Sequence, residues 1–276
     1  MTNNKTVSKK KESNVIPFDI ASLEADAGLG LQEVTQEDLA LPFLKILTAE
    51  AAETVGGEAR GADIFNSVTQ EVFKGDVGIR VIPCLYQRRY IEWAPQGTQG
   101  APLNIYTPKD KADKTMPKTE QRGKDDRTDY IVGSENYLEN TAHHYVVVVD
   151  DDGRMETGLI TMKKTALKKS KGWNSMMNSR IEMGKEGPFI APSFRYRYHL
   201  TTEKAKNDKG QWNTWKIILD GPVLNFDEKG NLEDPKDLEI YNFCKAFAGS
   251  ILEGSVIVKH ESDEVPVEKD AGEAPF

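Results

Sequence analysis

Apolar side chains at every second position predict a mostly antiparallel β fold. Ile79, Val81 and Pro83 show this period of two, which is typical of a strand with one buried face. Turn residues such as Asp152–Gly153 separate strand-like runs and supply the positive φ that tight hairpins need. The strands expected from these patterns are 63–73, 77–93, 145–149, 155–162, 193–202, 212–219 and 255–259.

Two segments with apolar residues at helical spacing interrupt the strands. Trp173, Met177 and Ile181 fall on one stripe of residues 163–183, and a glycine follows this expected helix. Residues 235–252 form a second amphipathic segment. Hairpins with helices between them predict an α+β fold that is mostly β. We expect an antiparallel barrel with helical insertions, and the OB-fold is the first candidate.

Local composition divides the chain into parts. Residues 1–35 are polar, which predicts a mobile N-terminal arm, whereas residues 36–260 carry the periodic patterns of one OB-like domain. Within that domain, residues 95–141 lack periodicity and are rich in Pro, Gly, Lys and Asp, so we expect a long loop insertion. Residues 261–276 have too few apolar side chains to form a core, which predicts a disordered tail.

The distribution of charge changes the meaning of the composition. The formal net charge of the 276 residues is −8, which by itself disfavours a nucleic-acid partner. Residues 154–216, however, contain fourteen lysines and arginines against five acidic residues, a balance of +9. A solvated, charge-rich surface is the plain structural explanation of such a block. Aromatic residues interleaved with the charges favour a binding surface instead.

Basic and aromatic residues occur together in three segments: a strand end, a helix and a hairpin. Single strands of nucleic acid are held by cationic grooves that follow the phosphates and by aromatic rings that stack on bases, at ~1–3 kcal/mol per base. The alternative is that the aromatic face of residues 194–200 is simply core, which still leaves two arginines outward. The candidate nucleic-acid-binding residues are Arg88, Arg89, Tyr90, Trp93, Lys164, Lys168, Lys171, Trp173, Arg195, Tyr196, Arg197, Tyr198, Trp212, Trp215 and Lys216.

Patterns typical of catalysis are missing from the sequence. The four histidines show no spacing that resembles a zinc site, and neither a phosphate-binding loop nor a nucleophile elbow occurs. Asp150–Asp152 is better explained as a turn than as a cation site. We therefore expect no enzymatic activity, no catalytic residue, no cofactor and no metal.

The sequence also indicates where the protein is found. Cys84 and Cys244 suggest no disulfide framework, so a reducing compartment is favoured. No apolar run approaches the ~18 residues of a membrane span, and the N-terminus does not resemble a signal peptide. We expect a cytoplasmic protein with no membrane partner.

The C-terminal segment combines acidic residues with a terminal aromatic ring. Residues 261–276 carry six acidic residues against one lysine. A solubilising end is the plain explanation, but a terminal Phe and its carboxylate can be captured by a basic-rimmed pocket of a partner protein. The tail could also compete with DNA for the protein's own cationic surface, in which case its deletion would tighten binding at low salt. The candidate partner-binding residues are Asp263, Glu264, Glu268, Asp270, Glu273, Pro275 and Phe276.

Several segments resemble the single-stranded DNA-binding proteins of tailed phages. The end Ala274-Pro275-Phe276 is similar to the tails of bacterial and phage proteins of this type, and four internal segments resemble the phage group: 41–47, 61–69, 88–93 and 194–215. The resemblance implies an OB-fold core, sequence-tolerant binding and a tail that recruits replication or recombination proteins. The tail departs from the bacterial pattern because no Asp run precedes Pro275 and Lys269 interrupts it.

The patterns together with this resemblance imply a bacteriophage protein in the cytoplasm of a bacterial host cell. We expect it to bind and protect single-stranded DNA during DNA replication, recombination or repair. A homo-oligomer is compatible with the sequence. One alternative is a nucleic-acid enzyme, such as a nuclease or an annealing recombinase, that uses the same surface. Another is a phage structural or transcription-associated protein whose basic block meets an acidic partner.

Overall fold

A computed structural model describes residues 20–34, 38–51, 54, 57, 59–124, 126–208, 210–256, 258 and 260. The chain divides into two compact units, Met1–Leu39 and Ala40–Phe276. The first unit contains the short helix α1 (Ile20–Ala25), which was not expected within the N-terminal arm. The predicted acidic tail lies outside the described residues.

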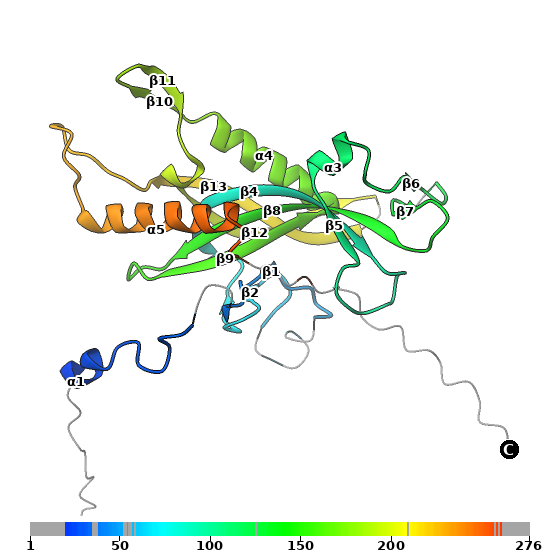
Figure 1. Cartoon of the computed structure of the whole chain (residues 1–276), viewed down its shortest axis with the longest axis horizontal. Helices are drawn as coiled ribbons and strands as arrows, with labels where there is room; N and C mark the ends of the chain where they lie inside the picture. The colour runs from blue at the N-terminus through cyan, green and yellow to red at the C-terminus, as the bar shows by residue number, and fades with distance from the viewer. Residues whose placement is uncertain are drawn as a thin grey trace, which may run out of the picture. The chain divides into compact units, whose positions relative to one another are not determined.

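Two long antiparallel strands organise the second unit. Strands β4 (Ile79–Trp93) and β8 (Tyr137–Val149) pair from Val81 opposite Val148 to Trp93 opposite Tyr137, with a bulge between Pro83 and Leu85. Figure 1 shows them side by side in the middle of the sheet. Both strands are rich in β-branched residues at their first or last positions, where the sheet is covered on both faces.

Different strands flank the two ends of the β4–β8 pair. At one end β12 (Tyr196–Asn207) and β13 (Gly210–Pro222) extend the sheet beyond β4, and β9 (Met155–Lys163) extends it beyond β8. At the other end three short strands do so: β5 (Asn104–Tyr106) beside β4, then β7 (Asp129–Ile131) and β6 (Thr119–Glu120) beyond β8. The predicted hairpins 145–162 and 193–219 are thus present.

The expected loop insertion at 95–141 is not structureless. It contains β5, helix α3 (Pro108–Ala112), β6 and β7, and β8 begins inside it. A capping box between Thr107 and Asp110 starts α3, with Pro108 in the first turn, where its missing N–H costs nothing. Elements of two to five residues are too short to show periodicity, which is why the sequence pattern missed them.

A small three-stranded sheet adjoins the main one. It consists of β1 (Leu44–Ile46), β2 (Ile64–Asn66) and β3 (Val72–Phe73). The N–H of Leu159 in β9 donates to the carbonyl of Pro42 at 2.8 Å, and β1 also lies near β13. Among the described strands, no ladder joins β1 to β13. The fold is therefore mostly β and antiparallel, as predicted, but the expected closed barrel is absent because this seam is not hydrogen-bonded.

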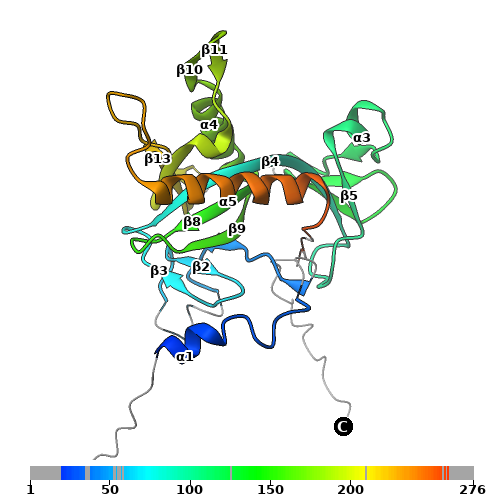
Figure 2. The same cartoon turned by 60° about the vertical axis from the view of Figure 1, so that its left-hand side comes forward.

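Two apolar cores lie on opposite faces of the sheet. Helix α5 (Pro235–Leu252) lies across one face (Figure 2) and buries Cys244, Phe247 and Ile251 against it. This helix has the predicted bounds because Asp234 caps it and Pro235 occupies its first turn. The second core lies between the sheet, β1–β2 and helix α4 (Leu167–Asn178).

Helix α4 ends five residues before the predicted end of its periodic segment, at Asn178 rather than Met183. Residues Ile181–Gly184 and Gly187–Ile190 instead form the hairpin β10–β11. Ile181 is exposed there, so it does not continue the buried stripe of Trp173. None of the helices within the described part of the chain is long and apolar enough to cross a membrane.

One glycine shows how closely the backbones of β12 and of the turn before β4 approach each other. Gly78 has φ of +76°, and a Cβ there would lie 2.1 Å from the carbonyl oxygen of Leu200. We predict that Gly78→Ala lowers the free energy of unfolding by about 2 kcal/mol or more, because it combines backbone strain with a clash. Gly172→Ala is the matched control: it lies in α4 with nothing near its Cβ position, and should stabilise by ~0.5–1 kcal/mol. Urea denaturation monitored by circular dichroism measures both, and equal effects would contradict the prediction.

Candidate nucleic-acid interface

The middle of β4 presents a row of alternating aromatic and basic side chains. Tyr86, Arg88 and Tyr90 occupy every second position and share one face of the sheet. The Arg88 Nε–H donates to Oδ1 of Asn140 on β8, and its Nη1 lies 3.5 Å from the Tyr86 hydroxyl. Within the described residues no carboxylate forms an ion pair with Arg88, so its charge is available to an anion.

Lysines border this row on two sides. The ammonium group of Lys111 on α3 lies 5.0 Å from the centre of the Tyr90 ring, an arrangement that adds a cation beside an aromatic face. Lys163, the last residue of β9, pairs with Thr141, so Lys164 follows next to the position of Asn140. Lys164, Lys168 and Lys171 are all exposed.

Helix α4 lies on the same face as the row. The ring of His144 lies 5.1 Å from that of Tyr86 and stacks on Trp173 of α4 at 4.5 Å. Neither α4 nor the 3-10 turn Lys164–Ala166 before it has a side-chain cap or an acidic residue in its first turn. The N-terminus of α4 thus keeps its positive end, which favours anions. We call Tyr86, Arg88, Tyr90, Lys111, Lys164 and Lys168 the basic strip.

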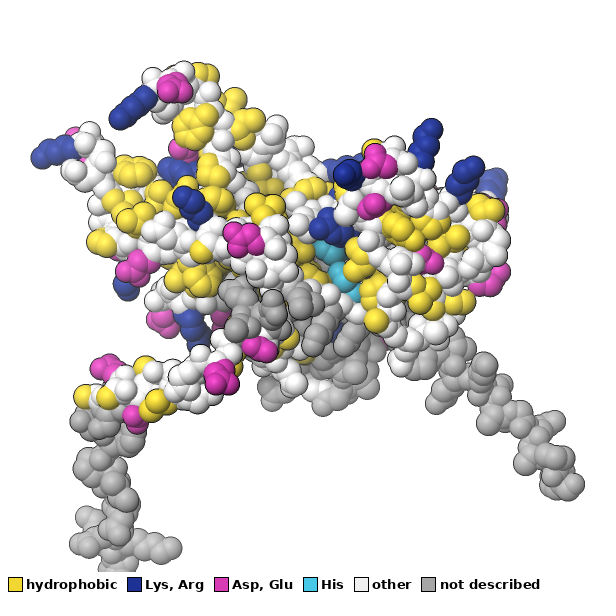
Figure 3. Space-filling view, in the orientation of Figure 1, with side chains coloured by type: hydrophobic (Ala, Val, Ile, Leu, Met, Phe, Trp, Pro, Cys, Tyr) yellow, Lys and Arg dark blue, Asp and Glu magenta, His cyan; other side chains and the backbone are white. Residues whose placement is uncertain are grey.

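The side chains of the opposite face, on which α5 lies, are the ones seen in Figure 3. Lysine and arginine side chains lie there beside a depression in which histidine side chains are visible, whereas His144, on the face of the basic strip, is 0% exposed. Lys164 itself has φ of +49°, an uncommon conformation for a residue with a side chain. The turn from β9 into α4 holds this lysine in place at some cost in backbone energy.

Four of the predicted binding aromatics are core residues. Trp93, Trp173, Tyr198 and Trp215 are all buried, and Trp173 is 0% exposed. Trp173 also meets Tyr198 edge-on at 5.7 Å, and His144 donates to or accepts from the Ser170 hydroxyl at 2.8 Å. Trp173, Tyr198 and Trp215 pack in the core shared by α4, β12 and β13, and none of the four side chains has a surface on which a base could stack. The core explanation of the aromatic face of β12 is the one that the structure supports.

The two arginines of residues 195–197 are paired with acidic side chains. Arg195 Nε lies 2.8 Å from Glu182 Oε1, and the same oxygen accepts from the Tyr196 hydroxyl at 2.9 Å. Arg197 Nε lies 2.6 Å from Asp220 Oδ2. These contacts neutralise much of the charge that the sequence suggested for this segment.

The remaining predicted residues lie elsewhere on the sheet. Trp212 is half-buried opposite Ala205, and Lys216 is exposed opposite Thr201, so both lie at the far part of the β12–β13 hairpin. Since β12 pairs with β4 only at Ile79–Val81, this part of the hairpin extends away from Arg88. Arg89 points to the face opposite Arg88.

The sequence interpretation missed three residues of this surface: Tyr86, Lys111 and Asn140. Tyr86 could have been found, because it precedes Arg88 by two positions on a predicted strand. Lys111 and Asn140 could not, since both lie in the segment that the sequence suggested was a loop.

A buried carboxylate attaches the insertion to the basic strip. Glu92 accepts from Asn104 at 2.8 Å, from the Tyr106 hydroxyl at 2.9 Å and from Asn136 at 3.1 Å. Burial alone would raise the pKa of Glu92, but these hydrogen bonds outweigh burial and lower it. Burial and the adjacent Glu92 raise the pKa of Tyr106 to about 12. This network fixes β5, and with it α3 and Lys111, beside Tyr90.

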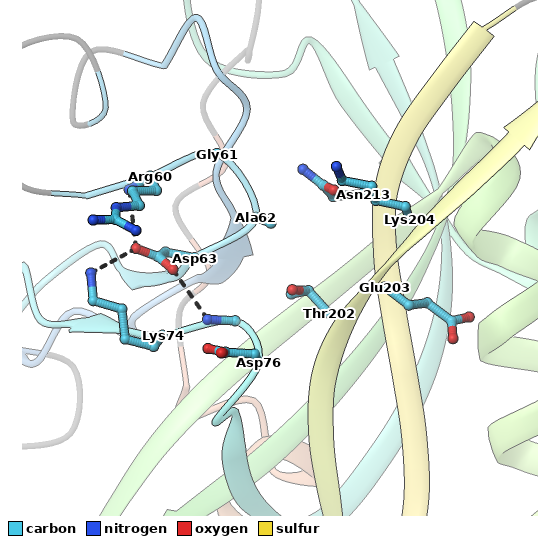
Figure 4. A pocket seen from close by; sticks show the side chains of 11 residues that line it. Arg60, Gly61, Ala62, Asp63, Lys74, Asp76, Thr202, Glu203, Lys204 and Asn213 are labelled. Atoms are coloured by element: carbon cyan, nitrogen blue, oxygen red, sulfur yellow. Dashed lines mark hydrogen bonds and ion pairs between the residues drawn. The ribbon is translucent and has the colours of Figure 1, made fainter.

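A hollow of about 310 Å³ lies between β12–β13 and the turn before β4 (Figure 4). Asp63, which is 6% exposed, lies at its edge and accepts from Lys74 Nζ at 3.0 Å, from the Arg60 N–H at 3.0 Å and from the Gly75 N–H at 3.1 Å. Burial would raise the pKa of Asp63, but these donors lower it overall. Its carboxylate therefore serves the fold, holding two turns together.

The described residues contain no group of three or more His, Cys, Asp or Glu side chains that could hold a metal ion. A family model described as Pam3 phage gp34-like protein matches residues 10–257. No curated protein and no solved structure matches the chain.

Proposed function

The chain belongs to the Pam3 phage gp34-like protein family, and on that premise we propose that it binds single-stranded DNA without catalysis. It would act in the replication, recombination or repair of phage DNA. The observation that carries the proposal is the basic strip, in which Arg88 alternates with tyrosines and has only neutral hydrogen-bond partners among the described residues.

The strip contains both kinds of group that bind single strands. Arg88, Lys111, Lys164 and Lys168 would hold successive phosphates, with the uncapped N-terminus of α4 as a further anion-binding element. The Tyr90 ring, half-buried beside Lys111, offers a face for one base. The strip consists of arginine, lysine and tyrosine side chains, which can hold phosphates and stack on any base, so we expect binding that tolerates any sequence.

An OB-type core is part of the proposal. The main sheet and β1 surround one apolar core, with β1 beside β9 on one side and near β13 on the other. This incomplete ring supports an OB-like interpretation, in which α4 covers one opening of the ring. The lack of a ladder between β1 and β13 leaves the ring open among the described strands.

The acidic tail has its own part in the proposal. Residues 261–276, with Phe276 at the end, would recruit replication or recombination proteins of the phage or its host. Those residues lie outside the described part of the chain, so this function is supported by their composition alone.

Fluorescence anisotropy of labelled oligo(dT) tests DNA binding. Three of the four tryptophans are buried, so intrinsic fluorescence would respond weakly to DNA. We expect binding at low salt, with log K falling with log salt at a slope of about −3, because four cations would each release about 0.7 counterion. Absence of binding at low salt, or binding that does not depend on salt, would refute the proposal. Cleavage of the oligonucleotide upon adding Mg²⁺ would favour a nuclease instead.

A further inference from the structure

The face of β4–β8 opposite the basic strip contains a pair of buried histidines. His143 of β8 is 1% exposed, and neither of its ring nitrogens has a hydrogen-bond partner in the described structure. The ring of His260 lies 4.9 Å from it at an angle of 34°, and His260 is 9% exposed. An unpaired buried polar group costs ~1–3 kcal/mol, so two unpaired nitrogens on one ring need an explanation.

Positive charge surrounds this pair. Arg89 lies on the same face of β4, where its guanidinium donates to the Arg88 carbonyl oxygen at 2.9 Å and to Gln87 Oε1. Both acceptors are neutral, because one is a backbone carbonyl and the other is a side-chain amide. Glu139 of β8 lies on this face too, and its carboxylate is 3.2 Å from the ammonium group of Lys163. Burial is the main cause that lowers the pKa of His143 to about 3 and of His260 to about 4, and the charge of Arg89 lowers both further.

We propose that Arg89, His143 and His260 form a binding site for a phosphate-type oxyanion. A guanidinium presents parallel N–H groups that match two oxygens of a phosphate. Each imidazole is neutral at pH 7 and therefore has one N–H that can donate to the same anion. A bound oxyanion would supply the partner that His143 lacks and a counter-charge for Arg89.

A metal ion fits these residues less well than an anion. Two imidazoles could bind a transition metal, but metal sites in proteins usually add a third ligand, a carboxylate or a thiolate. The charge of Arg89 acts on both rings, and a guanidinium repels a cation and cannot lose its proton. The charge of the site thus selects the sign of its ligand.

The site does not depend on the proposed function. Arg89 and the histidine pair lie on the sheet face opposite Arg88, so a free phosphate or a nucleotide could occupy the site whether or not the basic strip binds DNA. A phosphodiester of a bound DNA strand has the same chemistry. Titration with oligo(dT), as a second arm of the experiment, distinguishes a phosphate of DNA from a free phosphate.

Long-range ¹H–¹⁵N NMR of the histidine rings in the full chain tests the site with inorganic phosphate as the probe. We expect saturable shifts of the His143 and His260 signals at millimolar phosphate, against sodium chloride at equal ionic strength. Arg89→Gln should weaken phosphate binding by about tenfold or more, since it removes a charged bidentate contact. Lys229→Gln, which removes one positive charge from an exposed position before α5, is the matched control and should leave the phosphate titration unchanged.

Two results would overturn the proposal: no saturable shift of either ring, or equal phosphate binding by the wild type and Arg89→Gln. Should Arg89→Gln not fold, Arg89→Lys keeps the charge but loses the planar fork and should still bind phosphate more weakly.

Titration with oligo(dT) forms the second arm. If oligo(dT) shifts the signals of the same two rings and Arg89→Gln abolishes these shifts, the phosphate comes from DNA. If inorganic phosphate shifts the signals and oligo(dT) does not, the natural ligand is a free phosphate. Failure of oligonucleotide binding leaves the phosphate result intact.

Discussion

Replacing Arg88, Lys164 and Lys168 together with glutamine should weaken oligo(dT) binding by about 10- to 100-fold at low salt, because the strip loses three of its phosphate contacts. The slope of log K against log salt should become shallower by about 2, since each contact with a single strand releases about 0.7 counterion. Glutamine can still donate to Asn140 as Arg88 does, so the fold should be retained. Fluorescence anisotropy across a series of salt concentrations measures both quantities.

A matched triple variant controls for net charge. Lys229, Lys236 and Lys245 are exposed on and before α5, on other elements than the basic strip. Changing all three to glutamine removes the same charge from the protein. Compared at 0.1 M salt, where attraction is screened beyond ~10 Å, this variant should alter affinity only slightly. Equal losses in the two triple variants would mean that only overall charge matters, and the strip would then have no special role.

Acidification from pH 6.5 to pH 5 should lower the free energy of unfolding by roughly 4–6 kcal/mol. His143, His144 and His260 are buried, and desolvation lowers the pKa of the first two to about 3 and of the third to about 4, against an ordinary 6.5. In this interval the unfolded chain binds protons that the folded chain does not. The stability that these residues contribute is therefore complete above pH 6.5 and is lost as the pH falls toward their folded values.

Each such histidine contributes about 1.4 kcal/mol per pH unit, and the total is comparable with the whole stability of a typical domain. Urea denaturation at pH 7, 6 and 5 measures the loss. Buffers without phosphate are needed, because a bound oxyanion would favour the charged imidazoles. His144→Gln can still bond to Ser170, and it should reduce the pH dependence by about one third. Equal stability at pH 7 and pH 5 would contradict the prediction.

The sequence predicted those helices and hairpins whose caps and turn residues lie next to them in the chain. Helix α5 has its cap at Asp234 and a proline at its start, so its bounds could be read from the sequence. The hairpin of β8 and β9 is marked by its Asp152–Gly153 turn, where Gly153 has φ of +81°. The insertion could not be predicted, because β5 depends on the distant carboxylate of Glu92.

The candidate site was predicted only in part because core and surface use the same residue types. Arg88, Tyr90, Lys164 and Lys168 belong to the basic strip, and their binding of nucleic acid stays a prediction. Trp173 has an equally suggestive sequence context, with lysines on both sides, yet it packs against His144 in the core. Which side of α4 faces the sheet is decided by contacts with β8 and β12, and these residues are distant in sequence.

The long pairing of β4 with β8 also has a consequence during synthesis of the protein. β4 is complete well before its partner, because the whole insertion is translated between them. Until β8 emerges, the apolar run around Ile79–Leu85 is an unpaired strand that could join another chain. Pro83 interrupts this run, and Arg88 and Arg89 follow it, as gatekeeper residues commonly do beside aggregation-prone segments. The two arginines would thus keep the nascent chain soluble before either of them meets a ligand.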